Sequence, residues 1–285
     1  MQSKPGYRIV KLKSGTHSIH SLAHGETFHP VIGPAAEAEA LYVRQLELVD
    51  RLHHQGGEFV IWDVGLGSAA NALTVLRATR EIHSFVRLAS FDATLEPLRF
   101  GLQHARPLGY FAGFEDAVQT LLTEHQVNFE NSKQKVEWML YVGDFPSLLS
   151  QTAAQSWPKP HVIMFDPYSP AKNPSMWTVS LFNSLFLLLD RARPCALPTY
   201  SRSTMMRVAL LVAGFYVGVG HPTGEKEETT IAANSTSLIT EPLDRRWLER
   251  AFRSASAEPM REPIYRQAPL SPETRETLKA HPQFR

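Results

Sequence analysis

The residues with the clearest chemical potential lie in one proline-rich segment, residues 164–177, with the sequence MFDPYSPAKNPSMW. The apolar run 161–165 predicts a strand, and Asp166 follows it directly. Because proline fixes φ and excludes helix, Pro167 and the prolines after it hold the polar groups of the loop in a rigid geometry. Open α/β sheets bind ligands at the carboxyl ends of their strands, where Asp166 is expected. An ordinary surface loop is the alternative, but so many constrained residues favour a functional loop.

A second candidate site follows the predicted strand 59–62, in the turn DVGLGS at residues 63–68. Glycines permit a tight turn and a close approach of the backbone to a ligand. A dinucleotide-binding turn would carry a third glycine at position 70, which is alanine. A carboxylate at Asp63 would repel a pyrophosphate, whereas it suits the cationic groups of S-adenosylmethionine. The turn therefore favours S-adenosylmethionine over NAD as the cofactor.

Acidic residues recur where the later strands end. The predicted strand 86–91 is followed by Asp92. An acid at this position binds ribose hydroxyls both in folds that bind NAD and in folds that bind S-adenosylmethionine. The predicted strand 136–142 is followed by a glycine and Asp144, where an acid typically accepts a hydrogen bond from an adenine amino group. Capping of the next helix is the alternative role for each of these two acids. The acids at the ends of successive strands are Asp63, Asp92, Asp144 and Asp166. Their joint occurrence predicts one ligand-binding edge.

Strand and helix patterns alternate through the middle of the chain, which predicts a parallel sheet covered on both faces. Helices are expected at residues 35–54, 69–80, 95–104, 115–125, 145–154, 179–190 and 204–213, and a further strand at 195–200. The last two strands, 215–219 and 229–233, are joined by a segment too short for a right-handed crossover. We therefore expect them to form an antiparallel hairpin. A methyltransferase sheet ends in this way, whereas a dinucleotide-binding sheet usually stays parallel.

The two ends of the chain lie outside this alternation. Residues 7–12 and 16–22 alternate around a Ser-Gly turn, which predicts a small β-hairpin. Residues 241–285 are rich in arginine and proline and contain helical patterns near 245–252 and 272–279. The predicted organisation is an N-terminal β-hairpin extension (1–33), a main domain (34–240) and a C-terminal basic appendage (241–285).

Composition limits the possible partners. The chain has 285 residues, of which 43% are hydrophobic and 20% charged, as in an ordinary globular protein. No apolar run approaches membrane-spanning length and the start of the chain has no signal-like apolar segment, so we expect a cytoplasmic protein with no membrane partner. A single cysteine, Cys195, and histidines without ligand spacing predict no metal site.

A formal net charge of +1 means that a polyanionic partner would require a local basic patch. Arginines near the predicted strand 195–200 and in the C-terminal appendage are candidates for contacts with RNA phosphates, although solvated helix faces are the alternative. These arginines are Arg191, Arg193, Arg202, Arg207, Arg245, Arg246, Arg250, Arg253, Arg261 and Arg266.

With these residues in view, the chain resembles the methyltransferase domain of the MnmC family of tRNA wobble-uridine methyltransferases, over about residues 20–235. The family loop Asp-x-Phe-x-Pro-x-Lys-Asn-Pro-x-x-Trp is matched by Asp166, Tyr168 in place of Phe, Pro170, Lys172, Asn173, Pro174 and Trp177. The family turn Gly-x-Gly-Thr-Gly-x-Asn is matched by Gly65, Gly67, Ser68 in place of Thr, and Asn71. Later Thr-Tyr-Ser and Gly-Phe patterns are matched by Thr199, Tyr200, Ser201, Gly214 and Phe215.

Two departures from the family pattern affect the expected cofactor turn. Ala69 interrupts the second pair of glycines, and Asp63 stands where glutamate is more usual. Both departures leave the predicted cofactor the same but put the detailed geometry of its binding turn in question. No second nucleotide-binding motif follows, so the chain resembles the stand-alone form without the FAD oxidase domain.

The resemblance implies a Rossmann-like, class I S-adenosylmethionine-dependent methyltransferase fold. It also implies transfer of a methyl group to the primary amine of 5-aminomethyl-2-thiouridine, or its oxygen analogue, at position 34 in the anticodon stem-loop of tRNA. The product would be the 5-methylaminomethyl nucleoside. A primary alkyl amine has a pKa on the order of 10 by analogy with lysine, so it must lose a proton before it can react.

Residue roles follow from the same resemblance. Asp166 would be catalytic, since its carboxylate and the adjacent backbone carbonyl of Pro167 accept hydrogen bonds from the amine and orient its lone pair. Tyr168 would stack on the uracil. Lys172 would contact phosphate or be a solvated lysine, and Asn173 would contact the substrate or lock the loop. The cofactor-binding residues would be Glu26, Asp63, Gly65, Gly67, Asn71, Asp92 and Asp144, with His29 helping Glu26 to close over the cofactor.

Two other functions stay open. A spermidine-synthase-like aminopropyltransferase shares this fold, an N-terminal hairpin and a strand-end aspartate that faces an amine. It would carry further acids along a polyamine channel, and the Lys-Asn-Pro loop argues against it. A non-catalytic RNA- or nucleotide-binding module would bind the cofactor without turnover.

Overall fold

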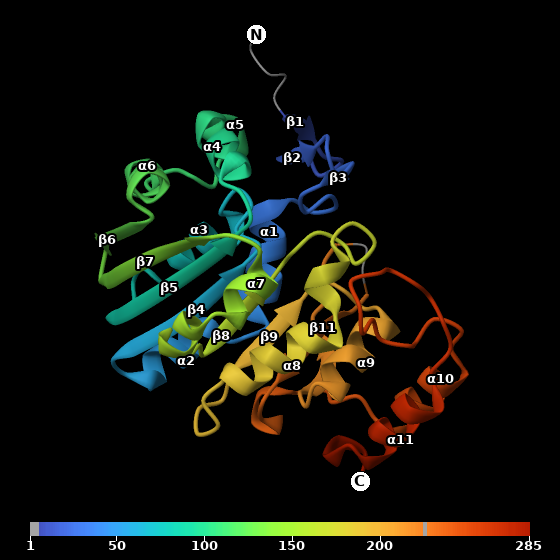
Figure 1. The fold of residues 1–285 in the computed structure, drawn as a ribbon. Coiled ribbons are helices and arrows are strands. Elements are labelled where there is room, and N and C mark those ends of the chain that lie inside the picture. Colours follow the sequence, from blue (N-terminus) through green and yellow to red (C-terminus); the bar gives the residue numbers. More distant parts are fainter. Residues whose placement is uncertain (1–5, 225–226) are drawn as a thin grey trace. The chain divides into compact units, whose positions relative to one another are not determined.

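Strands and helices alternate along most of the chain in the computed structural model, which describes residues 6–224 and 227–285 (Figure 1). The contacts divide the chain into two units. Unit 1 comprises Met1–Asp144 and Pro222–Glu227, and unit 2 comprises Phe145–His221 and Glu228–Arg285. The predicted three-part division at residues 33 and 240 stays a prediction. Within the described ranges, no helix has the length and apolar character needed to cross a bilayer.

The sheet strands of unit 1 are β4 (Glu58–Val64), β5 (Ser84–Asp92), β6 (Gln126–Asn131) and β7 (Gln134–Val142). They lie in the order β4-β5-β7-β6. The pairs β4–β5 and β5–β7 are parallel, as predicted, and β6 adds an antiparallel edge strand that the sequence reading missed. Six of the seven residues of β4 are buried, as expected of a strand covered on both faces.

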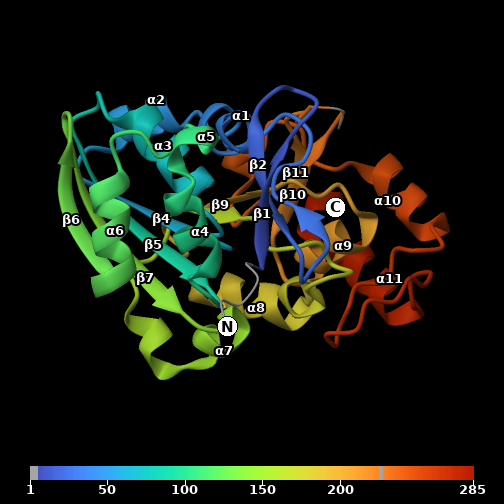
Figure 2. The ribbon, with the colours of Figure 1, turned by 90° about the horizontal axis from the view of Figure 1, so that it is seen from above.

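The helices of unit 1 that lie among these strands in the sequence are α3 (Ala70–Thr79), α4 (Glu96–Gln103), α5 (Ala105–Leu108) and α6 (Glu115–Glu124). The predicted helices 69–80, 95–104 and 115–125 are thus confirmed to within a few residues. Figure 2 shows α4 and α6 lying along the same side of β5 and β7. Helix α3 follows β4 and α4 follows β5, whereas α5 and α6 come after α4 and before β6.

The predicted continuous helix 35–54 is wrong in its middle. The segment consists of α1 (Pro34–Ala38), a π-helical stretch (Glu39–Arg44) and α2 (Leu48–Gln55). The π-helical stretch ends at Arg44, and Glu47, with φ 48° in the left-handed region, is the N-cap residue of α2. The apolar spacing that suggested one helix is real, because Leu41, Val43 and Leu52 are all buried.

The N-terminal hairpin is confirmed and gains a third strand. Strand β1 (Tyr7–Lys11) pairs antiparallel with β2 (His17–Ser21), which pairs antiparallel with the short β3 (Glu26–Thr27). The first five residues of the predicted extension 1–33 lie outside the described residues.

Unit 2 contains the strands β8 (Val162–Phe165), β9 (Ala196–Thr199), β10 (Tyr216–Gly220) and β11 (Thr229–Ala233), in the order β10-β11-β9-β8. Strand β8 is parallel to β9, whereas β11 is antiparallel to both β9 and β10. The predicted terminal antiparallel hairpin is therefore confirmed, and its second strand, β11, lies next to β9.

The helices of unit 2 that belong to this alternation are α7 (Phe145–Ser150), α8 (Val179–Leu188) and α9 (Thr204–Val212). The predicted helix 145–154 ends earlier, and Thr152–Ser156 forms a 3-10 helix. Apolar packing around β8 is dense, since the Phe165 ring lies 5.3 Å from Trp177 and 5.5 Å from Phe182, measured between ring centroids.

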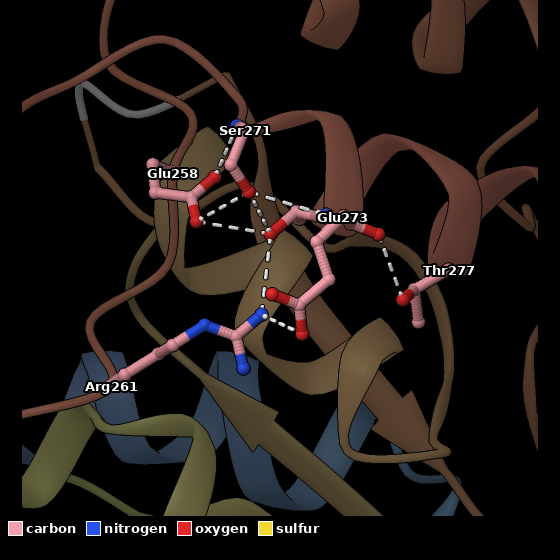
Figure 3. A network of polar contacts seen from close by, with 6 residues as sticks. Glu258, Arg261, Ser271, Glu273 and Thr277 are labelled. Atoms are coloured by element: carbon pink, nitrogen blue, oxygen red, sulfur yellow. Dashed lines mark hydrogen bonds and ion pairs between the residues drawn. The ribbon is translucent and has the colours of Figure 1, made fainter.

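The C-terminal segment is ordered and belongs to unit 2. Glu241 and Leu243 pair with the backbone of β10, and α10 (Arg245–Arg253) and α11 (Pro272–Ala280) follow, which confirms both predicted helical patterns. Figure 3 shows how the loop before α11 is closed. The Glu258 carboxylate accepts hydrogen bonds from the Ser271 backbone N–H (2.8 Å) and from the hydroxyls of Ser271 and Thr274 (both 3.0 Å).

Candidate active site

In unit 1, the turn after β4 is held in a shape that glycine favours. Gly65 has φ 91° and Gly67 has φ 52°, both in the left-handed region. The Gly65 and Leu66 N–H groups donate to the Phe91 carbonyl (3.0 and 3.2 Å), which ties the turn to β5. A Cβ atom on Gly67 would lie 3.3 Å from the Phe28 ring. Tight space and positive φ together explain the glycine at position 67.

Asp92, the last residue of β5, connects the glycine turn to the end of its own strand. Its Oδ2 accepts a hydrogen bond from the Gly67 N–H (2.8 Å) and its Oδ1 from the Thr94 N–H (3.1 Å). A carboxylate offers about four acceptor positions, so this partly exposed side chain can also accept from ribose hydroxyls. The alternative of a helix cap is wrong, because the N-cap residue of α4 is Leu95.

The electrostatic environment of Asp92 combines two opposing effects. Removal from water raises the pKa of its carboxyl group, and hydrogen bonds from the amides of Gly67, Thr94 and Ala93 act in the opposite direction. Donors that satisfy a carboxylate before any ligand arrives keep it in one position. The arrangement is a fixed acceptor at the end of a parallel strand.

Asp63, near the end of β4, is fully buried in the sheet and takes part in a hydrogen-bond chain. The Ser90 hydroxyl donates to Asp63 Oδ2 (3.0 Å), and Trp138 Nε1 donates to Ser90 Oγ (2.9 Å). The chain therefore crosses the three parallel strands β4, β5 and β7. The glycine motif predicted an acid at this position, whereas its partners Ser90 and Trp138 gave no sequence signal because they stand in ordinary strand patterns.

Asp144 lies two residues beyond β7 and is exposed. The Gly143 N–H before it donates to the Asp92 carbonyl (2.9 Å), so the turn after β7 is tied to the end of β5. Unit 1 thus places Asp63, Asp92 and Asp144 at the carboxyl ends of three neighbouring parallel strands. The three acids differ in exposure, from fully buried through partly exposed to exposed.

The start of α3 is supported by a tyrosine that the sequence reading missed. Ser68 Oγ lies 2.6 Å from the Tyr110 hydroxyl, and burial raises the pKa of Tyr110, which keeps it neutral. Arg77 of α3 holds the Tyr110 segment by donating to the carbonyls of Tyr110 (3.0 Å) and Ala112 (2.9 Å). Ala69, the departure from the glycine pattern, has φ 63°, in the left-handed region that glycine favours.

Asn71 and Glu26, the remaining predicted cofactor residues, lie on either side of this turn in the sequence. Asn71 is buried near the start of α3. Glu26 is partly exposed in β3, two residues before Phe28, whose ring lies beside Gly67. His29 Nδ1 lies 3.7 Å from the Glu37 carboxylate. The N-terminal segment around Phe28 therefore adjoins the glycine turn.

The residues of unit 1 fit S-adenosylmethionine in their chemistry. Positive-φ glycines allow a ligand to approach the backbone, and Asp92 retains acceptor capacity for hydroxyl groups. Asp144 offers an exposed carboxylate for an amino group. Across the described part of the chain, no group of three or more His, Cys, Asp or Glu side chains is placed to hold a metal ion.

In unit 2, Asp166 follows β8 and begins a loop that aromatic side chains hold in place. The Trp177 indole N–H donates to the Tyr168 carbonyl (2.9 Å), and the Tyr200 hydroxyl donates to the Pro167 carbonyl (3.1 Å). The Trp177 and Tyr200 rings meet edge to face, with centroids 6.0 Å apart. Pro167 is buried, while Asp166 and Tyr168 are partly exposed. The sequence matched Tyr200 only as part of a family pattern. Its hydrogen bond to the Pro167 carbonyl is seen only in the structure.

Hydrogen bonds within the loop fix its second half. The Lys172 and Asn173 N–H groups donate to the Ser169 carbonyl (2.9 and 2.8 Å). Ser175 Oγ donates to Asn173 Oδ1 (2.9 Å), at the start of the 3-10 helix Pro174–Trp177. Asn173 thus takes part in the hydrogen bonds within the loop, and its role toward the substrate stays a prediction. Lys172 is exposed.

Arg207 does not belong to the predicted phosphate-contacting surface. Its side chain is 3% exposed, and it donates to Thr230 Oγ1 (2.9 Å), the Thr229 carbonyl (2.7 Å) and the Glu228 carboxylate (3.1 Å). Burial lowers the pKa of Arg207, and Glu228 acts in the opposite direction. This arginine joins α9 to β11. Other arginines with internal partners include Arg193, bonded to the Lys159 carbonyl, and Arg245, bonded to the Phe284 carbonyl.

Comparison with known proteins defines the class. Residues 111–235 match the model of a family described as S-adenosyl-L-methionine-dependent methyltransferase. A solved structure of MnmC2 from Aquifex aeolicus superposes with a TM-score of 0.68 at 21% identity, covering 97% of this chain and 84% of that one. The chain is therefore similar to S-adenosylmethionine-dependent methyltransferases and has their Rossmann-like α/β fold. The predicted fold class and cofactor are confirmed.

Relatives point to a particular family. The chain is 24% identical over 225 residues to the tRNA 5-methylaminomethyl-2-thiouridine biosynthesis bifunctional protein MnmC of Leptospira interrogans, covering 76% of this chain and 34% of that protein. It is 28% identical over 200 residues to MnmC of Aeromonas salmonicida, covering 63% and 28%. The predicted resemblance to the MnmC family is confirmed. The chain spans about a third of the length of these relatives.

A spermidine synthase structure shares the fold more distantly. It superposes with a TM-score of 0.52 at 10% identity, covering 95% of this chain and 83% of that one. The similarity extends over most of both chains, yet the identity is half that of the MnmC2 structure. The comparison concerns the fold alone.

Proposed function

We propose that this protein transfers a methyl group from S-adenosylmethionine to the primary amine of 5-aminomethyluridine, or its 2-thio form, at the wobble position 34 of tRNA. The observation that carries the proposal is the locked loop that starts at Asp166. Its carboxylate follows a parallel strand in a methyltransferase fold, and Trp177 and Tyr200 hold the two carbonyls after it. The relatives named above modify tRNA uridines, which supports this substrate.

The roles of the residues follow from the chemistry of the amine. When bound, S-adenosylmethionine supplies a methyl group on a sulfonium, which a neutral amine accepts as S-adenosylhomocysteine leaves. Asp166 accepts a proton from the substrate ammonium and keeps a hydrogen bond to the resulting amine. The Pro167 carbonyl has a second lone pair beside the one that Tyr200 occupies, and it accepts from the same nitrogen. Tyr168 stacks on the uracil and Lys172 contacts a phosphate.

The cofactor residues of unit 1 act by fixed hydrogen bonding. Asp92 accepts from the ribose hydroxyls and Asp144 from the adenine amino group. The buried Asp63, oriented by Ser90, favours the positive charge of the cofactor. Gly65, Gly67 and Asn71 shape the turn, and Glu26 closes over it from the N-terminal segment.

The test uses labelled donors and two kinds of acceptor. Purified protein is incubated with methyl-labelled S-adenosylmethionine and bulk tRNA from cells that lack this protein. In parallel it is incubated with labelled decarboxylated S-adenosylmethionine and putrescine, the substrates of an aminopropyltransferase. We expect label in tRNA and none in polyamine. Label in polyamine would establish the aminopropyltransferase instead, and cofactor binding without label in either acceptor would indicate a non-catalytic module.

A further inference from the structure

The loop that carries Asp166 is connected to an exposed arginine through Tyr200. The Tyr200 hydroxyl holds the Pro167 carbonyl at 3.1 Å, and Arg202 lies two residues further along the chain. Arg202 is exposed, and it precedes α9, which starts at Thr204. A positive charge is therefore anchored beside the segment that follows the carboxyl end of β9.

A second set of arginines lies on one face of α10. Arg246, Arg250 and Arg253 are exposed and follow the i, i+4, i+7 spacing that places side chains in one row. Trp247, Leu248 and Ala251 are buried on the other side of the helix. The row extends over about 10 Å at 1.5 Å per residue. A single small anion would not require a row of this length.

The two sets converge on Arg207. The positive charges of Arg202 and Arg250 both lower the pKa of this buried guanidinium, after the larger effect of burial, so both lie within electrostatic range of it. The backbone explains the proximity, because Glu241 and Leu243 pair along β10 immediately before α10 (Figure 1). Arg202 before α9 and Arg250 on α10 therefore act electrostatically on the same buried arginine.

Within residues 6–224 and 227–285, these exposed arginines have no acidic partners of their own. Among the described residues, no carboxylate lies within ion-pair distance of Arg202, Arg246, Arg250 or Arg253. Arg193 and Arg261, in contrast, pair with Asp190 and Glu273. Neighbouring charges of one sign repel each other and are stabilised when an anion binds. Guanidinium groups match phosphate geometry with two parallel hydrogen bonds.

We propose that Arg202 and Arg250, extended along α10 by Arg246 and Arg253, form a track that binds successive phosphates of an RNA backbone and leads to the Asp166 loop. This inference rests on the proposed function and deepens it, because it states which surface holds the polynucleotide. The row length and the absence of acidic partners suit a polyanion better than a mononucleotide. The track accounts for an RNA substrate in a protein whose net charge is only +1.

The test compares two double variants that remove the same charge. Arg202→Gln with Arg250→Gln changes the track. Arg106→Gln with Lys279→Gln is the control, since Arg106 is exposed in α5 and Lys279 is exposed at the end of α11. The binding of an unmodified tRNA transcript is measured by fluorescence anisotropy at several KCl concentrations, without cofactor. S-adenosylmethionine affinity is measured separately by calorimetry.

We expect the track variant to bind the transcript about 10-fold more weakly and to reduce the slope of log K against log salt by about 1 to 2, since each lost phosphate contact removes about 0.7 to 0.9. Its cofactor affinity should equal that of wild type. An unchanged slope, or an equal loss in the control variant, would overturn the track. If the slope falls as expected while wild type methylates no tRNA, the track stands and the proposed function fails.

Discussion

The cofactor side in unit 1 and the loop in unit 2 achieve rigidity in opposite ways. In unit 1, carboxylate side chains accept hydrogen bonds from the protein: Asp63 from Ser90, and Asp92 from backbone amides that include those of Gly67 and Thr94. In unit 2, aromatic side chains donate to backbone carbonyls, as Trp177 and Tyr200 do. The acids of unit 1 are thus held by donors to their own carboxylates, whereas the loop of unit 2 is held by donors to the backbone carbonyls after its acid.

This difference predicts that substitutions in the two units separate binding from turnover. A carboxylate that organises a cofactor turn should control cofactor affinity. A carboxylate that handles a proton should control the rate at saturating substrate. Substitutions of Asp166, Asp92 and Tyr200 test this separation, in order of decreasing expected effect, and a smaller effect on stability is expected at His281.

Asp166→Asn should lower kcat for methyl transfer by about 10²–10⁴-fold, because the amide can neither accept the proton of the ammonium nor carry negative charge. Its affinity for S-adenosylmethionine should stay at the wild-type value. Single-turnover kinetics and calorimetry measure the two quantities. Glu276→Gln, an exposed change on α11, is the control for the loss of one negative charge. Near-normal turnover in Asp166→Asn would remove the catalytic role.

Asp92→Asn should show the reverse pattern. The side-chain amide cannot accept from both the Gly67 and Thr94 N–H groups, so one donor loses its partner and the glycine turn is loosened. A lost hydrogen bond to a charged group costs about 1.5–3 kcal/mol, which corresponds to cofactor affinity about 10–100-fold weaker. Calorimetric titration tests this, with Asp50→Asn on the exposed face of α2 as the control. Unchanged affinity would show that Asp92 has no part in the cofactor site.

Tyr200→Phe should lower kcat by about 5–10-fold, since a neutral hydrogen bond contributes about 1 kcal/mol. The ring remains against Trp177, so only the hydroxyl that holds the Pro167 carbonyl is lost. Cofactor affinity should not change. Tyr265→Phe, at an exposed position, provides the matched control. If Tyr200→Phe weakened cofactor binding instead, the separation of roles would be wrong.

A smaller effect is expected from His281, which is buried and accepts a hydrogen bond from the Gln283 N–H through Nδ1. Burial lowers the pKa of this imidazole below its ordinary value of about 6.5. The unfolded chain then binds a proton more readily than the folded one, so stability is complete above that pH and falls as the pH drops below it. The loss between about pH 7 and pH 6 should be at most about 1 kcal/mol.

Chemical denaturation at both pH values measures this change. His281 is the N-cap residue of the 3-10 helix Pro282–Phe284. His281→Asn retains an acceptor at this position and carries no titrating group, so the contribution of position 281 to the pH dependence should disappear. An identical pH dependence in wild type and His281→Asn would assign the effect to other groups.

The sequence predicted the alternation of strands and helices, the terminal hairpin and the acids at the strand ends. Each of these depends on local pattern, since buried strands are apolar and glycine marks a turn with positive φ. The break at Glu47 and the edge strand β6 were not predicted. One left-handed residue and one exposed strand change the spacing of apolar residues in the sequence only slightly.

The partners of the acids could not be predicted. Ser90 and Trp138 stand 27 and 75 residues from Asp63, counted from their numbers, and only the register of β4, β5 and β7 brings them together. Arg207 was predicted as a candidate phosphate contact, but its side chain is buried and bonds to Glu228 and Thr230. Prolines predicted a rigid loop after β8, but the hydrogen bonds that fix it come from Trp177 and Tyr200.

The most direct measurement of the central claim is the identity of the methylated nucleoside. Bulk tRNA lacking the modification is treated with the protein and S-adenosylmethionine, digested to nucleosides and analysed by mass spectrometry. The account predicts loss of 5-aminomethyl-2-thiouridine with stoichiometric gain of the 5-methylaminomethyl nucleoside, and neither change with Asp166→Asn. Methylation of another nucleoside, or no change with the wild-type protein, would contradict it.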